Sequence, residues 1–333
     1  MRIEKVKKIV LYIFRIFIVL ALVMIVFRND YREIFNCIKN VSITGLIILL
    51  VMEIIYLFLD SAACYLLIHS QFPFFKFRQA LVVTFIGIFG NVATFSAGII
   101  PMQSYYLYKY GIQVGNSVGM MNLKYIFHKL TIFIYAGVMI FFNRVWIKSA
   151  VPELIKYIYI GFGVCAVIIE FLILICTLEP VQKLLMKLIE KLPDTSKWEK
   201  RKSVWISNLQ ALYKESKTIL SNKICCINIV AVNLLKLFCL YTIPFVCIKM
   251  LNLPEIIFTE IQILSSVMLL ITGVLPNIAG LGAAEFSFLL IFSNFMGRIE
   301  ASSALVLYRT ATYFFPFILS IFVVFNIKKI IAK

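Results

Sequence analysis

Residues 273–285, GVLPNIAGLGAAE, place a proline, three glycines and a carboxylate in the middle of a long apolar stretch. Proline and glycine weaken or break an α-helix, and a break inside a membrane leaves backbone groups that only protein or trapped water can satisfy. The sequence therefore predicts apolar helices on both sides of a buried, irregular turn. Such a turn is where a membrane protein is expected to keep its functional site.

A second broken segment lies in the first half of the chain, at residues 85–109, FIGIFGNVATFSAGIIPMQSYYLYK. Its tetrapeptide 98–101, GIIP, resembles the tetrapeptide 273–276, GVLP. Paired apolar segments broken by glycine and proline in two halves of a chain are typical of transporters whose site lies where two repeats meet. A chance match of four residues is the alternative, because short motifs carry false positives.

The composition predicts the fold class. The chain is 62% hydrophobic with only 15% charged residues, which lies well outside the average of soluble proteins, and it contains many apolar runs of the roughly 20 residues that a membrane-crossing helix needs. We therefore expect an all-α polytopic membrane protein. The first run, residues 9–27, is interpreted as a retained span with Arg15 near the membrane surface, because it is too long for a signal peptide and lacks a cleavage site.

The distribution of charge orients the chain. Lysine and arginine outnumber aspartate and glutamate by 33 to 16, and the surplus collects at the ends of apolar runs, as it does in cytoplasmic loops of membrane proteins. No nucleic-acid-binding module is indicated. The amino end, residues 76–78, residues 179–223 and the carboxyl end are the basic segments, so both termini are expected in the cytoplasm of a cell-membrane protein.

Eight apolar runs are long enough to be spans: 9–27, 43–68, 122–142, 157–178, 224–250, 257–275, 278–296 and 302–327. If residues 81–101 also crossed the membrane, the basic segment 179–223 would face the outside. We therefore expect 81–101 to be re-entrant, entering and leaving on the cytoplasmic side. Residues 278–296 are a second candidate for a re-entrant element.

Three regions follow from this topology. Residues 1–178 form a first transmembrane half, residues 179–223 a basic cytoplasmic linker, and residues 224–333 a second half that contains the broken segment 273–285. In the linker, leucines recur at helical spacing opposite lysines, which is typical of an amphipathic helix on an anionic membrane surface. A solvated linker stays open as the alternative.

Residues 272–316, TGVLPNIAGLGAAEFSFLLIFSNFMGRIEASSALVLYRTATYFFP, resemble the carboxy-terminal signature of the lysylphosphatidylglycerol synthase transmembrane family. Residues 95–112, FSAGIIPMQSYYLYKYGI, resemble that family's amino-terminal segment. The family forms the flippase-type region of multiple-peptide-resistance proteins. This chain departs from its pattern at Ile99 and Ile100, where many relatives have Gly-Gln, and at Ile278 and Ala279, where they have Pro-Gly. These substitutions remove flexibility and an amide group from the expected site, so the resemblance does not determine the substrate.

The resemblance implies translocation or binding of membrane lipid, with an anionic or aminoacylated phospholipid such as lysyl-phosphatidylglycerol as partner. Full-length relatives add a soluble transferase domain that uses lysyl-tRNA, and the residues after Phe325 are too few for it. Two alternatives stay open. In the first alternative, the chain is the membrane part of a phosphatidylglycerol lysyltransferase that acts with a separate catalytic chain. In the second, it is a membrane partner of polyprenyl-linked glycosyl transfer. A homo-oligomer also stays open.

Charged residues in apolar runs are candidates for binding the lipid head group, because charge at membrane depth is costly. Glu285 is placed to accept an ammonium group or to pair with Arg309, whose guanidinium suits phosphate. A buried pair that only fixes helix packing is the alternative. Lys124 and His128 lie one helical turn apart and suit phosphate, with snorkelling toward the membrane surface as the alternative.

Polar residues after the first break complete the candidate set, since Gln103 and Tyr106 suit hydrogen bonding to a head group or gating. Carboxylates with no identifiable partner, among them Asp60 and Glu53, rank lower. No cofactor, catalytic residue or metal site is expected, because the cysteines lack ligand spacing and only two histidines are present. The candidate residues are Pro101, Gln103, Tyr106, Lys124, His128, Pro276, Gly280, Gly282, Glu285 and Arg309.

Overall fold

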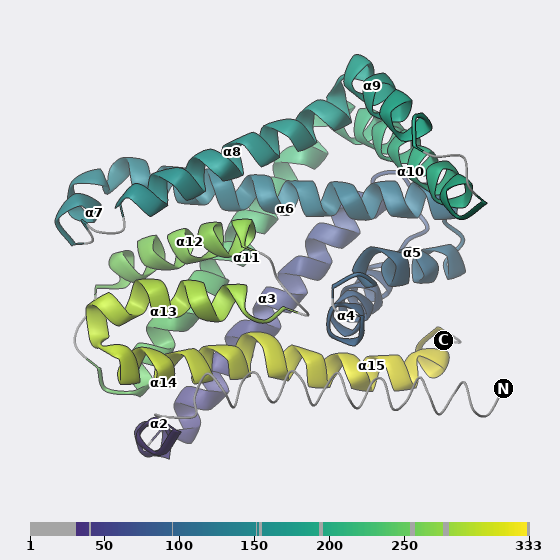
Figure 1. The fold of residues 1–333 in the computed structure, drawn as a ribbon. Helices are drawn as coiled ribbons and strands as arrows, with labels where there is room; N and C mark the ends of the chain where they lie inside the picture. The colour runs from purple at the N-terminus through teal and green to yellow at the C-terminus, as the bar shows by residue number, and fades with distance from the viewer. Residues whose placement is uncertain are drawn as a thin grey trace.

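The computed structural model describes residues 31–39, 41–94, 96–150, 152, 155–192, 196–253, 257–275 and 280–331. The expected first span 9–27 and the candidate residue Pro276 lie outside these ranges. Within them the regular elements are helices (Figure 1).

In the described part of the chain, five helical stretches are long and apolar enough to cross a membrane. They are α3 (Ile43–His69), α6 (Val114–Phe142), α8 (Ile155–Thr177), α11 (Lys223–Met250) and the continuous run Arg298–Asn326. That run joins α14 (Arg298–Arg309), the π-helical segment η2 (Thr310–Phe314) and most of α15 (Phe315–Ile331). The prediction of an all-α polytopic membrane protein is therefore confirmed.

The ends of the long helices lie within four residues of the expected spans except at α6. This helix begins at Val114 rather than at residue 122. Its first turns pack against α10 (Ser196–Ser221), and a Cβ added at Gly119 would lie 2.8 Å from the backbone oxygen of Ala211. The bare glycine thus lets the two helices approach closely, and this packing stabilises a helical stretch that is not apolar enough to be recognised as a span.

Helices from distant parts of the chain pack on one another. The pair α3 and α11 lies along the centre of the molecule, and Met250 covers Gly45, where a Cβ would lie 2.6 Å from the methionine Cγ (Figure 1). Near the carboxyl end of the chain, α15 packs on α4 (Phe77–Ala93) from the first half. The core is thus built from both halves of the sequence.

Two pairs of short helices double back on themselves. In the first pair, α4 is followed by α5 (Ile99–Lys109); in the second, α12 (Phe258–Val274) is followed by α13 (Ala283–Met296) (Figure 1). The longest of these has 17 residues, or about 25 Å of helix, which is less than the roughly 30 Å of a hydrocarbon core. The breaks fall in the two segments that the sequence singled out.

The first break is held by its own polar side chains. Ser96, with φ of +70°, donates from Oγ to Asn91 Oδ1 at 2.8 Å, and Thr94 Oγ1 accepts from the Gly98 backbone N–H at 2.5 Å. Backbone groups freed by the break are thereby partly satisfied inside the protein. This is the condition under which irregular backbone is tolerated at membrane depth.

The tips of the two broken pairs meet in the middle of the molecule. A Cβ added at Gly280 would lie 3.1 Å from Asn91 Nδ2 and 2.9 Å from the ring of Tyr313. Asn91 lies in the last turn of α4, and Tyr313 lies in the π-helical segment η2. Single π-helical turns inside α-helices are frequent at functional sites.

The linker 179–223 contains two helices, α9 (Glu179–Glu190) and α10. They are joined by a hydrogen bond from Gln182 Nε2 to the Leu209 carbonyl oxygen at 2.5 Å, and the apolar side chains of Leu184 and Leu188 are exposed. The helical, amphipathic pattern is therefore present, and its placement on the membrane surface stays a prediction. Two short helices complete the described chain, α2 (Tyr31–Lys39) and α7 (Arg144–Ala150).

The re-entrant assignment of 81–101 has a direct test. In a cysteine-light variant, Lys109→Cys and Gln113→Cys place thiols at exposed positions just after the first broken pair. Impermeant thiol reagent is expected to label them only from the cytoplasmic side, whereas Lys39→Cys in α2 is the control for the outer face. Labelling of Lys109→Cys from outside at the rate of the control contradicts the assignment.

Candidate functional site

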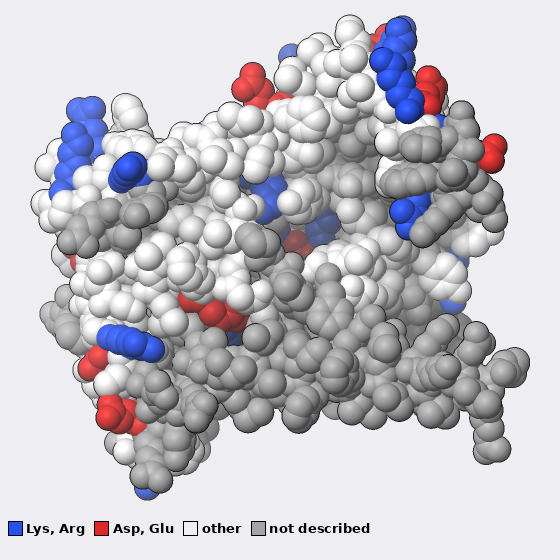
Figure 2. All heavy atoms as spheres, viewed as in Figure 1, with Lys and Arg blue, Asp and Glu red and all other residues white. Residues whose placement is uncertain are grey.

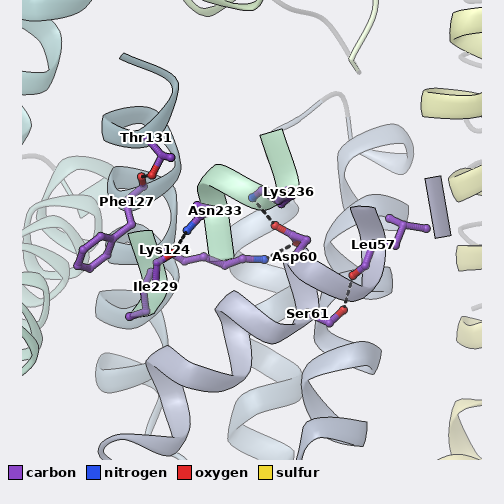
Figure 3. Close-up of polar contacts among 9 residues, drawn as sticks. All are labelled: Leu57, Asp60, Ser61, Lys124, Phe127, Thr131, Ile229, Asn233 and Lys236. Atoms are coloured by element: carbon purple, nitrogen blue, oxygen red, sulfur yellow. Dashed lines mark hydrogen bonds and ion pairs between the residues drawn. The ribbon is translucent and has the colours of Figure 1, made fainter. Parts of the chain in front are cut away.

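Three charged side chains from three helices meet inside the bundle. Lys124 of α6 donates to Asp60 Oδ2 at 2.6 Å, and Lys236 at the centre of α11 donates to Asp60 Oδ1 at 2.9 Å (Figure 3). The Lys236 side chain is 1% exposed, that of Lys124 14% and that of Asp60 19%. The close-up shows the carboxylate of α3 between the two ammonium groups.

This charge cluster of Asp60, Lys124 and Lys236 carries one more positive than negative charge. A buried ion pair is stable only when its partners compensate one another, and an uncompensated charge inside a membrane protein is expensive. His128, one turn after Lys124, has a buried Nδ1 atom with no hydrogen-bond partner among the described residues. The arrangement therefore suits an anion, which would compensate the surplus charge.

Neutral polar side chains around the cluster are satisfied within their own helices. Ser61 donates to Leu57 O at 2.8 Å, Thr131 to Phe127 O at 2.7 Å and Asn233 to Ile229 O at 2.9 Å (Figure 3). These three side chains therefore form no bond between helices in the contacts described. The two ion pairs to Asp60 connect α3 with α6 and with α11.

The charged interior opens on one face of the molecule. Figure 2 shows a hollow between α6, α12 and α4, with basic and acidic atoms visible at its bottom. The rest of this central surface is mostly uncharged where it is described.

A separate ion pair, between Glu285 and Arg309, holds the turn at the start of α13. Arg309 Nε donates to Glu285 Oε1 at 2.5 Å, while Arg309 Nη2 contacts the same carboxylate and also the Gly280 carbonyl oxygen. Glu285 Oε2 accepts from the Gly282 backbone N–H at 2.6 Å. Both oxygens of this carboxylate are thus engaged, and the side chains are only 15% and 11% exposed.

The two glycines of this turn adopt backbone conformations that other residues avoid. Gly280 has φ of +86° and Gly282 has φ of +95°. Arg309 also lies over the Tyr313 ring, 5.1 Å from its centroid. The predicted pairing of Glu285 with Arg309 is therefore observed as a clamp on the hairpin tip, and its contact with a head group stays a prediction.

The remaining predicted residues lie in the first broken pair. Gln103 is buried and donates to Val83 O at 3.2 Å, where Gly87 makes room for its amide. Tyr106 is half-buried, with its ring 5.2 Å from the Lys109 ammonium, and Pro101 is exposed in the first turn of α5. Gln103 therefore fastens α5 to α4, and its predicted role in head-group binding is untested.

Sequence reasoning did not single out Lys236, and it identified no partner for Asp60, which the structure pairs with two lysines. The signal for Lys236 was its position at the centre of an apolar run. A charged side chain inside a membrane span is costly, and this cost alone makes such a residue a candidate for function. Glu53 is a similar case, because it is 1% exposed and its Oε2 has no hydrogen-bond partner among the described residues. It lies seven residues, or two helical turns, before Asp60 on α3.

In the described part of the chain, no group of three or more histidine, cysteine or acidic residues is placed to hold a metal ion. The cysteines described there are free thiols.

A search of curated proteins found no match to this chain. The family model described as the lysylphosphatidylglycerol synthase TM region matches residues 12–320, which is nearly the whole sequence. Both broken pairs, the charge cluster and the Glu285–Arg309 clamp fall inside the matched residues. The chain therefore belongs to the lysylphosphatidylglycerol synthase transmembrane family.

Proposed function

We propose that this membrane protein binds phospholipid by its head group inside the bundle and moves the lipid between leaflets. The observation that carries the proposal is the surplus positive charge of the Asp60, Lys124 and Lys236 cluster inside the bundle. A lipid phosphate has the charge that would compensate this surplus. The family's lipid-related role supports the same reading.

The geometry of the cluster suits a phosphate. Each lysine donates one of its three ammonium N–H groups in a hydrogen bond to Asp60. Two N–H groups on each lysine therefore remain as donors for a ligand. Charge-assisted hydrogen bonds from lysine to phosphate are about twice as strong as neutral ones. In this mechanism Asp60 is a positioning residue, since it holds the two ammonium groups together against their mutual repulsion.

An aminoacylated lipid also carries ammonium groups, and Glu53 supplies a carboxylate for one of them. Its unpartnered oxygen lies on α3, about 10 Å along the helix from Asp60 at 1.5 Å per residue. A phosphate at the lysines and an ammonium at Glu53 would satisfy both signs of charge in one head group. This supports an aminoacylated phospholipid as substrate.

The test is lipid transfer in vesicles. Purified protein in phosphatidylglycerol vesicles should speed the movement of an acyl-labelled phosphatidylglycerol to the outer leaflet, relative to vesicles without protein. Lysyl-phosphatidylglycerol should also be transferred, and Glu53→Gln should slow that lipid more than phosphatidylglycerol. Native protein that leaves both rates at the protein-free level contradicts the proposal.

A second candidate function follows from the word synthase in the description of the family. The chain would then be the membrane part of a lysyltransferase that works with a separate catalytic chain. We expect the purified protein, supplied with lysyl-tRNA and phosphatidylglycerol, to form no lysyl lipid, because none of its described sites combines an acyl acceptor with a base. Product formed by this chain alone would contradict the non-enzymatic function.

A further inference from the structure

Lys129 lies outside the charge cluster, in a groove between α6, α8 and α12. It lies close to the midpoint of the 29-residue helix α6, inside the expected span 122–142. A Cβ added at Gly273 would lie 3.1 Å from the Lys129 Nζ atom. The absence of a side chain at Gly273 thus lets the ammonium reach the tip of α12.

Lys129 is the charged residue of an otherwise apolar groove. Tyr125 and Cys165 stand beside it, and its aliphatic and aromatic lining residues are Ile132, Phe133, Ile168, Ile169, Leu269 and Leu270. Tyr125 is 49% exposed and Ile168 41% exposed, so the groove opens toward the surrounding bilayer. Its apolar lining therefore suits contact with one side of an acyl chain that otherwise stays in the bilayer.

No described carboxylate forms an ion pair with Lys129. Its closest aromatic contact is the ring of Tyr125, with Nζ 5.5 Å from the centroid. An ammonium group at membrane depth is costly without an anion, and the apolar lining of the groove supplies none. The charge complementarity thus points to an anionic ligand that itself carries an apolar chain.

The groove also adjoins the charge cluster. Lys129 follows His128 directly in α6, and His128 lies one turn from Lys124. A phosphate that leaves Lys124 would therefore meet the ammonium of Lys129 within about two turns of the same helix, some 7.5 Å farther along the axis. Basic groups thus run from the interior of the bundle to its lipid-facing side.

We propose that this groove is a lateral portal for phospholipid. The phosphodiester contacts Lys129 while one acyl chain lies along the groove and stays in the bilayer, so that only the head group enters the bundle. This inference rests on the proposed function, because it names the path that the transported lipid takes. A free anion without a chain would gain nothing from the apolar lining.

The test uses lipid labelling in the purified full chain, reconstituted in nanodiscs, and needs no transport. Phosphatidylglycerol and diacylglycerol, each with the same photoactivatable diazirine on one acyl chain, are activated by light, and the modified residues are mapped by mass spectrometry. Phosphatidylglycerol is expected to label the α8 and α12 walls of the groove about tenfold more than diacylglycerol, because only the former carries a charge for Lys129.

Three variants test the part played by the ammonium group. Lys129→Met should lower groove labelling by phosphatidylglycerol to the diacylglycerol level, Lys129→Arg should keep it, and Lys156→Gln, an exposed position near the start of α8, is the matched control. The melting temperature of each variant shows whether it is folded. Equal groove labelling by the two lipids in the native protein overturns the proposal, as does unchanged phosphatidylglycerol labelling in folded Lys129→Met.

These outcomes are separable from failure of the proposed function. If native protein transfers phosphatidylglycerol between leaflets but labels the groove equally with both lipids, the portal is wrong and transport stands. If the groove prefers phosphatidylglycerol but no transfer occurs, the groove is a lipid-binding site and the transport function is wrong.

Discussion

Lys236→Met is expected to slow phosphatidylglycerol transfer about 10- to 100-fold, because a hydrogen bond to a charged group contributes roughly 1.5 to 3 kcal/mol. The substitution leaves Asp60 paired with Lys124 and removes the surplus charge that we assign to phosphate binding. The protein should stay folded, since a neutral pair and an apolar side chain replace a buried, uncompensated ammonium. Transfer rate and melting temperature measured together check both parts.

Removing the carboxylate of the same cluster should lower stability instead of leaving the protein folded. Asp60→Asn leaves two buried lysines without their carboxylate, so we expect a loss of about 3 to 5 kcal/mol of stability. Lys223→Met, at the exposed start of the same helix as Lys236, is the matched control and should change neither quantity. A Lys236→Met protein that is folded and transfers lipid at the native rate rules out phosphate binding at this cluster.

The second large effect is expected at the hairpin tip. Glu285→Gln and Arg309→Gln should each cost about 3 to 5 kcal/mol, because each leaves a buried charge without its partner. Arg309→Gln should be the more damaging, since Arg309 also binds the Gly280 carbonyl oxygen. Thermal unfolding of both variants, with Glu170→Gln on the exposed side of α8 as the control, measures this.

The charge-reversed double variant sharpens this prediction. Glu285→Arg with Arg309→Glu keeps an ion pair. The Gly282 N–H loses its carboxylate acceptor at position 285, and the Gly280 carbonyl oxygen loses its guanidinium donor at position 309. We therefore expect no recovery of stability. Single variants that keep the native melting temperature and lose transfer would contradict the clamp role, and would instead support head-group binding by Glu285 and Arg309.

Local sequence signals were sufficient to predict the two broken pairs. Gly280 and Gly282 adopt positive φ values, the Thr94 hydroxyl accepts from the Gly98 backbone N–H at the start of α5, and the Ser96 hydroxyl donates to the Asn91 side chain. Such features depend on neighbouring residues only, so they can be read from composition and spacing. The same reasoning placed Glu285 correctly, three residues into a helix that begins with a turn.

The charge cluster could not be predicted in this way. Asp60 and Lys236 are 176 residues apart, and nothing local to either residue indicates that α3 and α11 pack side by side. The early start of α6 is a similar case, because it depends on packing against α10 at Gly119. Tertiary contacts of this kind decide which buried charges become partners, and a single sequence carries no signal for them.

The central claim is that surplus positive charge in the cluster binds the lipid phosphate during transfer. The most direct test adds Asp60→Asn to Lys236→Met, because the surplus charge is then restored on Lys124 alone. The account predicts that this folded double variant transfers phosphatidylglycerol faster than Lys236→Met. A folded double variant with a transfer rate equal to or below that of Lys236→Met would contradict it.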